Sequence, residues 1–265
     1  MKRSTRLLIL SLVSLSAILS CKKNDSDVNH PLNCILAKAF YFDTSGSVSD
    51  SVTYTYTGDY ITKFANASAY VTLEYTADRV ARRNFFTSTS PTPDAYDVAA
   101  YNGDGTLSNI KSYIVFGTFV QYAQCDFTYS GGKLSKLEVR QYDVYSGQLE
   151  LISSSTFTYT GNNISQSVNT YYDPGGGPPD IATLVYSFDN NENYFGKTNA
   201  IFTDYIFVDA IDGSIVPLLF SGNNVTKVTE GSDETLLVYT LDSNQNFYEF
   251  LFAGKKYSRY TYDCN

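Results

Sequence analysis

The side chains that could perform acid–base or nucleophilic chemistry are few and widely spaced in this chain. The single histidine, His30, lies beside Pro31 in a polar stretch near the N-terminus. A serine or cysteine nucleophile is usually activated by a histidine base, so catalysis of this kind is not expected. A site made only of carboxylates is the remaining catalytic option, although close carboxylates are also common on acidic surfaces. The two candidate pairs are Asp94 with Asp97 and Asp209 with Asp212.

Two segments have the spacing of the first ligands in a calcium-binding loop. An EF-hand-like loop also needs glycine at its sixth position, and here those positions hold Tyr194 and Phe247. Hairpin turns use the same Asp and Asn residues, so we expect turns at these places. The cysteines are too far apart for a zinc site, and we expect no metal and no other cofactor. The two segments are Asp189, Asn191, Asn193 and Asp242, Asn244, Asn246.

The cysteines and one serine offer covalent chemistry of other kinds. Cys21 belongs to the N-terminal segment, which leaves Cys34, Cys125 and Cys264. A disulfide between Cys34 and Cys264 would join the start of the fold to its end in an oxidising compartment. Cys125 alternates with apolar residues, so we expect it to be buried and to pack as a small apolar side chain. Ser51, between Asp50 and Val52, resembles an acceptor for O-glycosylation in Bacteroidota.

The N-terminus has the layout of a secretory signal peptide. Basic residues precede a thirteen-residue apolar stretch from Leu7 to Leu19, which is too short to span a membrane. The sequence from Ile18 to Cys21 resembles the lipobox of bacterial lipoproteins, which implies that the thiol of Cys21 is acylated. We therefore predict a signal peptide at 1–20, a lipidated cysteine with a flexible tether at 21–33, and one β domain at 34–265. A lipid at Cys21 would attach the protein to a membrane surface.

Charge argues against one class of partner. The chain has 19 basic and 27 acidic residues. Removal of residues 1–20 takes away three basic residues, which leaves 16 against 27 and a net charge of −11. Binding to nucleic acid requires a basic face, so we expect no nucleic-acid partner.

The chain repeats a short pattern at intervals of 19 to 32 residues. In each copy aromatic residues alternate with Thr or Ser, two turn residues follow, and an aliphatic residue with Ser, Thr or Lys comes next. Alternation places the apolar residues on one face of a strand, and Gly and Asn favour tight hairpins. The clearest turn centres are Gly58-Asp59, Gly131-Gly132, Gly161-Asn162 and Gly222-Asn223, and weaker ones are Ala77-Asp78, Gly103-Asp104, Asn190-Asn191 and Ser243-Asn244.

This pattern resembles YD-type repeats and the related repeat lipoproteins of Bacteroidota, which are grouped as domains of unknown function. The resemblance covers roughly residues 52–265, and the ending Tyr260, Tyr262, Asp263, Cys264 is similar to the usual ending of those proteins. It implies hairpin repeats in an outer-membrane or surface lipoprotein. The family has no established activity that could be carried over.

Successive hairpins joined by short turns should form an antiparallel meander. So many strands cannot stay flat, because twist accumulates and large open sheets curl. We therefore predict an all-β fold with a twisted, rolled sheet, barrel-like or shell-like, and leave closure open. Irregular loops are expected at 89–97 and 173–180, where Pro and Gly interrupt the pattern.

These observations favour a lipid-anchored cell-envelope protein, surface-exposed or periplasm-facing, with a non-catalytic binding or scaffold role. The partner would be a glycan or a neighbouring envelope protein. Two alternatives stay open. One is a carboxylate-based hydrolase that acts on envelope or extracellular polymers, which would need two converging acids. The other is an envelope-assembly factor that shelters an apolar guest in an unfilled groove.

Overall fold

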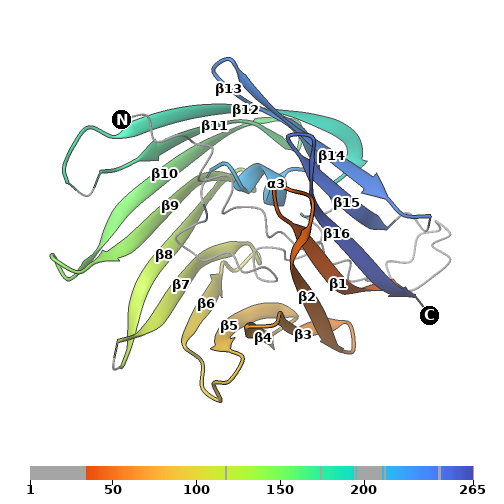
Figure 1. The fold of residues 1–265 in the computed structure, drawn as a ribbon. Helices are drawn as coiled ribbons and strands as arrows, with labels where there is room; N and C mark the ends of the chain where they lie inside the picture. Colours follow the sequence, from red (N-terminus) through yellow and green to blue (C-terminus); the bar gives the residue numbers. More distant parts are fainter. Residues whose placement is uncertain are drawn as a thin grey trace.

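The protein is a closed antiparallel β-barrel in which each strand pairs with its neighbours in sequence and β1 pairs with β16 (Figure 1). The computed structural model describes residues 34–264 except 117, 174, 194, 196–210, 212 and 244–245. The all-β meander predicted from the repeats is confirmed, and the sheet closes. The elements are β1 Cys34–Phe42, β2 Val48–Thr57, β3 Tyr60–Ala65, β4 Ala69–Thr76, β5 Arg79–Thr87, β6 Ala95–Tyr101, β7 Leu107–Phe116, β8 Thr118–Ser130, β9 Lys133–Asp143, β10 Gln148–Thr160, β11 Asn163–Tyr171, β12 Asp180–Glu192, α3 Val216–Phe220, β13 Asn223–Glu230, β14 Asp233–Leu241, β15 Phe247–Phe252 and β16 Lys255–Cys264.

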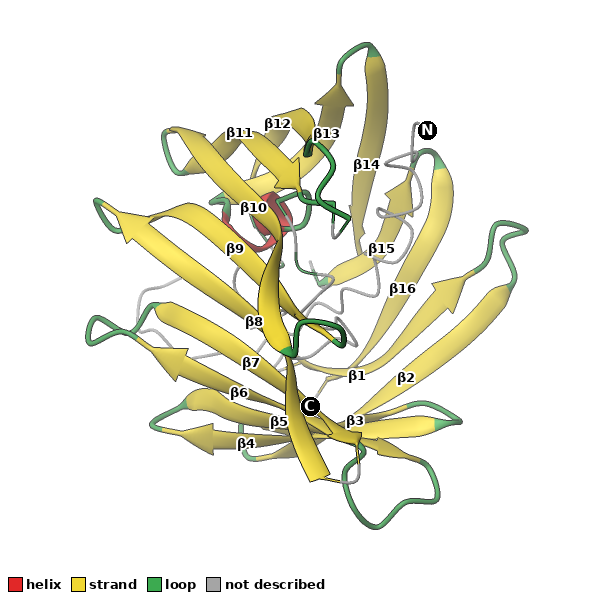
Figure 2. Ribbon diagram, turned by 90° about the vertical axis from the view of Figure 1, so that its left-hand side faces the viewer, coloured by secondary structure: helices red, strands yellow, loops and turns green. Residues whose placement is uncertain are grey.

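Connections alternate between the two ends of the barrel, because every neighbouring pair of strands is antiparallel. We call the end where β1 begins and β16 ends the disulfide end, since Cys34 and Cys264 are register partners there. The opposite, loop end carries the connections at 43–47, 66–68, 88–94 and 172–179. The side view shows the hairpins projecting at the ends of the tilted strands (Figure 2). Irregular loops therefore lie where Pro and Gly predicted them.

The strands bury one face toward the barrel interior and leave the other face to solvent. On β10, Thr156, Thr158 and Thr160 are exposed, whereas Phe157 and Tyr159 pack against the core. The inward side chains of β1 to β5 form a mainly apolar layer, with Arg83 of β5 as its charged member. This is the one-sided burial that the alternation of rings and hydroxyls predicted.

The outward face of the barrel is rich in hydroxyl and charged groups. Ion pairs join neighbouring strands there, such as Arg140 of β9 with Asp126 of β8 and Lys227 of β13 with Glu234 of β14, where Lys227 Nζ lies 2.7 Å from the Glu234 carboxylate. Outward apolar side chains are also present, and those on β12 and β14 are Ile181, Val185, Leu236 and Val238.

Tyrosine hydroxyls at the disulfide end form hydrogen bonds between successive repeats. These bonds explain why most copies of the repeat carry an aromatic residue just before the turn at that end. The hydroxyl of Tyr56 donates to the carbonyl of Leu36 at 3.0 Å, and that of Tyr75 donates to the carbonyl of Ile61 at 2.8 Å. Each hydroxyl thus reaches the backbone of the preceding repeat. The same link joins Tyr101 to Val80, Tyr129 to Leu107, Tyr159 to Leu134 and Tyr262 to Phe247.

A β-bulge lies beside five of these linked tyrosines. The register shifts immediately before Tyr56, Tyr75 and Tyr101, and again before Tyr129 and Tyr159. Because a bulge bends the strand and increases its twist, one at each repeat helps the sheet to curl into a barrel. The repeat therefore encodes both the curvature and the contact between successive hairpins.

One predicted hairpin is wrong. The turn centred on Gly222-Asn223 was expected to follow a strand that contains Leu218 and Phe220, but both residues lie in α3. Pro217 stands at the start of that helix, where its fixed φ suits the first turn and its missing N–H costs nothing. The weaker turn expected at Asn190-Asn191 is also wrong, since both residues continue β12.

Candidate functional site

The barrel interior contains the described part of the connection between β12 and β13, which includes residues 213–222. Its helix α3 lies within the ring of strands (Figure 1) and buries Val216 to Leu219. The Asn193 side chain donates to the carbonyls of Leu218 and Ser221, each at 2.8 Å. The amide of Ile164 on β11 donates to Ser221 Oγ at 3.1 Å. These bonds hold the connection against the inner wall at β11.

A second contact fixes this connection through Gly213. The hydroxyl of Tyr186 on β12 donates to the carbonyl of Gly213 at 3.1 Å. A Cβ atom at Gly213 would lie 1.8 Å from Asn169 Oδ1 and 2.5 Å from Ser155 Oγ. The wall at β10 and β11 therefore offers small polar side chains, and glycine is the residue that can approach it this closely.

A buried ion pair lies on the inner wall at β5 and β6. Arg83 and Asp97 are register partners and each is 1% exposed. Arg83 Nε donates to Asp97 Oδ2 at 2.8 Å, and its Nη2 donates to the same oxygen. Burial of two charges is costly unless they are paired, so this pair neutralises two groups that the barrel could not otherwise enclose.

Asp94 and Asp97 do not form a catalytic pair. Asp94 is exposed at the loop end, where its Oδ2 accepts a 2.7 Å hydrogen bond from the amide of Thr87. Asp97 is held by Arg83 inside the barrel. The other nominated residues, Asp209 and Asp212, lie outside the described residues. Asp94 and Asp97 thus have different roles, one in a loop and one in the wall.

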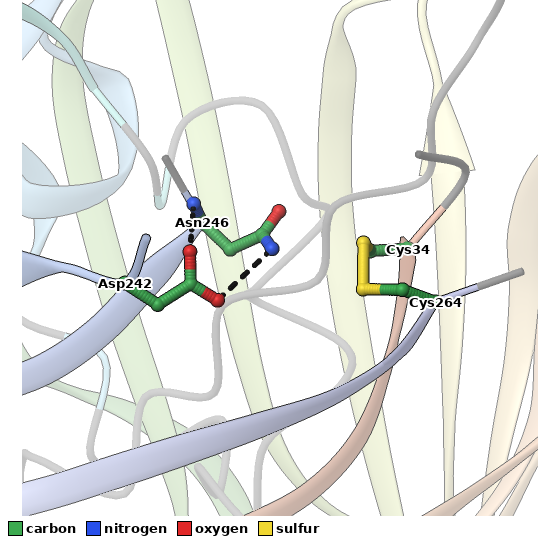
Figure 3. The surroundings of a disulfide bond; sticks show 4 residues. All are labelled: Cys34, Asp242, Asn246 and Cys264. Atoms are coloured by element: carbon green, nitrogen blue, oxygen red, sulfur yellow. Dashed lines mark hydrogen bonds between the residues drawn. A yellow bond between two sulfur atoms is a disulfide. The ribbon is translucent and has the colours of Figure 1, made fainter. Parts of the chain in front are cut away.

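The acids of the two calcium-like segments are engaged by neighbouring asparagines, at the irregular end of β12 in the first and in the turn after β14 in the second. Asp189 accepts hydrogen bonds from the amide and side chain of Asn191, both at 2.9 Å. Asp242 likewise accepts bonds from the amide and side chain of Asn246 (Figure 3), whereas Asn244 lies outside the described residues. Within the described ranges, no group of three or more His, Cys, Asp or Glu side chains is arranged to hold a metal ion.

The structure joins Cys34 to Cys264 in a disulfide, the pairing that the sequence analysis favoured (Figure 3). It links β1 to β16 across the seam where the barrel closes. Cys125 is a free, buried thiol on β8, and burial raises its pKa well above the usual value. It faces the core between Ala123 and Phe127, so its environment is that of a small hydrophobe.

Ser51 lies on β2 and its side chain is half-buried, next to the exposed Thr53. Its amide donates to Asp50 Oδ1 at 2.7 Å. Cys21 and His30 lie outside the described residues, as do the predicted signal peptide and tether. None of the helices in the described part of the chain is long and apolar enough to cross a membrane.

A cavity of about 370 Å³ opens at the loop end, beside the β1–β2 hairpin. Asp50 is its one charged lining residue, and the carboxylate is fixed by Ser51 N and by Asn66 Nδ2, the latter at 2.9 Å. Sequence reasoning missed this site, because Asp50 and Asn66 come from different hairpins and the one motif that includes Asp50 concerns Ser51. The lining residues are Tyr41, Phe42, Ser49, Asp50, Val52, Asn66 and Tyr257.

The comparisons with known proteins concern the fold. No protein-family model matches the chain, and no curated protein matches its sequence. A porin-like protein from Bacteroides vulgatus has a similar structure, with a TM-score of 0.55 and 12% sequence identity, over 86% of this chain and 98% of that one.

Two further structures are more distant. A porin-like protein from Bacteroides uniformis matches with a TM-score of 0.45 and 14% identity, over 91% of this chain and 94% of that one. A DUF3836 family protein from Parabacteroides distasonis matches with a TM-score of 0.29 and 14% identity, over 34% of this chain and 86% of that one. At these identities the likeness to the first structure shows a shared barrel fold.

Proposed function

We propose that this protein is a non-catalytic cell-envelope lipoprotein, whose barrel stands in water beside the membrane and serves as a binding or scaffold unit. Acylation of Cys21 would supply the anchor. The repeat lipoproteins of Bacteroidota that the sequence resembles support the lipid anchor, and the structural likeness to a porin-like protein from Bacteroides vulgatus supports a place in the cell envelope. The proposal includes no reaction.

The observation that carries this proposal is the distribution of side chains across the barrel wall. A barrel that crosses an outer membrane presents an apolar band to lipid and has polar side chains inside. Here the inward layer is mainly apolar, and its polar members are buried groups such as the Arg83–Asp97 pair and the small side chains at β10 and β11. Outward positions well inside the strands hold Lys38, Lys63 and Arg140, paired with Thr53, Thr72 and Gln124. Charge in the middle of a lipid-facing wall costs about 2–4 kcal/mol for each Lys or Arg, so this outer face is suited to water.

The topology supports an orientation for the anchored barrel. Strand β1 begins at the disulfide end, so a tether at 21–33 would join the barrel at that end. The disulfide end would then lie nearest the lipid. The loop end, with its cavity and the connections at 88–94 and 172–179, would point away from the membrane. We propose that a glycan or a neighbouring envelope protein is bound there.

The experiment that tests the proposal compares the wild type with Cys21→Ala in a Gram-negative host. Membranes are washed with alkaline carbonate, which removes proteins that lack an anchor or a membrane-spanning part. We expect the wild type to stay in the washed membranes and Cys21→Ala to appear in the soluble fraction with its disulfide formed. Retention of folded Cys21→Ala that has lost residues 1–20 would show that the barrel itself is inserted in the membrane. Recovery of the wild type in the soluble fraction would show that it carries no lipid anchor.

A further inference from the structure

We infer that the loop-end cavity binds a small organic cation, a protonated amine held by the Asp50 carboxylate between aromatic rings. The inference deepens the proposed function by naming a ligand class for the end that would face away from the membrane. It rests on the charge, geometry and size of the cavity lining.

The carboxylate is positioned before any ligand arrives. Asp50 Oδ1 accepts the amide of Ser51 at 2.7 Å and Oδ2 accepts Asn66 Nδ2 at 2.9 Å. Asn66 is itself fixed, because its Oδ1 accepts the amides of Ser68 and Ala69 at 3.0 and 2.8 Å. Each carboxylate oxygen has two lone pairs, so both oxygens keep acceptor capacity for an ammonium group.

The rest of the lining also favours positive charge. Its aromatic lining residues are Tyr41, Phe42 and Tyr257, and the negative face of an aromatic ring attracts a cation that can reach it. The Phe42 ring already has cations near it, since Lys256 Nζ lies 5.3 Å and Arg259 Cζ 5.6 Å from its centroid. Neither of these two side chains lines the cavity, and Lys256 is paired with Glu249.

Charge and size together select the ligand class. Asp50 is the one formal charge among the lining residues, so a cation is favoured over an anion at its carboxylate, and a neutral hydroxyl compound would gain hydrogen bonds there without the charge attraction. Hydrogen bonds to a charged partner are about twice as strong as neutral ones. A cavity of about 370 Å³ has room for a small amine or for an amine side chain.

The test is calorimetric titration of the full chain in a non-ionic detergent with 1,4-diaminobutane, and with 1,4-butanediol as the neutral probe of equal length. We expect the diamine to bind and the diol to bind at least about tenfold more weakly. Asp50→Asn keeps the shape and one acceptor but removes the charge, and it should weaken diamine binding by at least about tenfold. Phe42→Leu removes one ring face and should weaken it by a smaller factor.

Glu74→Gln is the matched control, because Glu74 lies on the outward face of β4, bonded to Asn84, away from the cavity. It should leave diamine binding unchanged, and near-ultraviolet circular dichroism shows whether each variant keeps its fold. Equal affinity for the diol and the diamine, or for Asp50→Asn and the wild type, would overturn the inference. So would a folded wild type that binds no diamine at millimolar concentration. Any of these results would overturn the proposed ligand class only. The proposed function would still hold if Cys21→Ala is released from membranes.

Discussion

At the scale of single residues, the tyrosine hydroxyls do more than fill the core. A tyrosine ring buries a large apolar area and its hydroxyl needs a partner once it is buried. In Tyr56, Tyr75 and Tyr101 that partner is a backbone carbonyl of the preceding hairpin. In the homologous positions of β12 and β14 the chain has Phe188 and Leu241, which cannot make this bond. These two positions flank the stretch where the interior is occupied by the connection that contains α3.

We predict that Tyr75→Phe lowers the free energy of unfolding by about 1 kcal/mol, because it removes one hydrogen bond and leaves the carbonyl of Ile61 without that partner. Chemical denaturation followed by circular dichroism measures the change. Tyr145→Phe is the control, since Tyr145 is 96% exposed in the β9–β10 connection and should leave stability unaltered. Equal stabilities of the two variants would show that the hydrogen bond from Tyr75 to the carbonyl of Ile61 does not stabilise the barrel.

We also predict that the barrel loses stability in alkali. Burial raises the pKa of Tyr75, Tyr101, Tyr129 and Tyr159 to about 12 from an ordinary value of 10.0. The folded state therefore retains phenolic protons that the unfolded chain releases, so this contribution is complete below pH 10 and is lost as the pH rises toward 12. Unfolding curves at increasing pH, together with the tyrosinate absorbance, measure it. Stability that stays constant through this window would contradict the burial of these hydroxyls.

Among the secondary-structure elements, the hairpins could be predicted from the sequence, whereas helix α3, which interrupts them, could not. Two-residue alternation and turn residues locate β2–β3, β8–β9 and β10–β11, because each hairpin is specified by its own residues. Helix α3 was missed because Leu218 and Phe220 alternate like strand residues over a span too short to distinguish the two periods. Pro217 was the available signal. The cavity at Asp50 was missed because three separate hairpins build it.

The connection that contains α3 offers a test at this scale. Gly213→Ala should destabilise the barrel by about 1–3 kcal/mol, because the new methyl group would overlap Asn169 and Ser155 and force the connection away from the wall. Gly103→Ala is the matched control, since a Cβ there meets nothing within 4 Å. Thermal unfolding of both variants measures the difference. If Gly213→Ala were as stable as Gly103→Ala, the connection would not be packed against β10 and β11.

At the scale of the whole molecule, closure is the property that local sequence could not predict. Closure requires β1 to meet β16 in register after the twist of every intervening hairpin has accumulated. The sequence of a single repeat does not determine this total twist. The disulfide between Cys34 and Cys264 spans a sequence separation of 230 residues. It therefore restrains the unfolded chain more than any local link could.

Replacing both cysteines of this seam with serine should lower the free energy of unfolding by about 2–4 kcal/mol. Thiol counting in denaturant gives an independent measure, because the unreduced full chain should show Cys125 as its free thiol among residues 34–264, and two more should appear after reduction. Three free thiols in that range before reduction would exclude the bond.

Spin-label accessibility on membrane-bound protein measures whether the outer wall of this barrel faces water. Labels are placed at Thr53→Cys and Thr156→Cys, outward positions within β2 and β10, and at Tyr145→Cys as an aqueous reference. We expect a water-soluble nickel chelate to relax the labels at Thr53 and Thr156 more than oxygen does, as at Tyr145. Stronger relaxation by oxygen at Thr53 and Thr156 would place the wall in lipid and contradict this expectation.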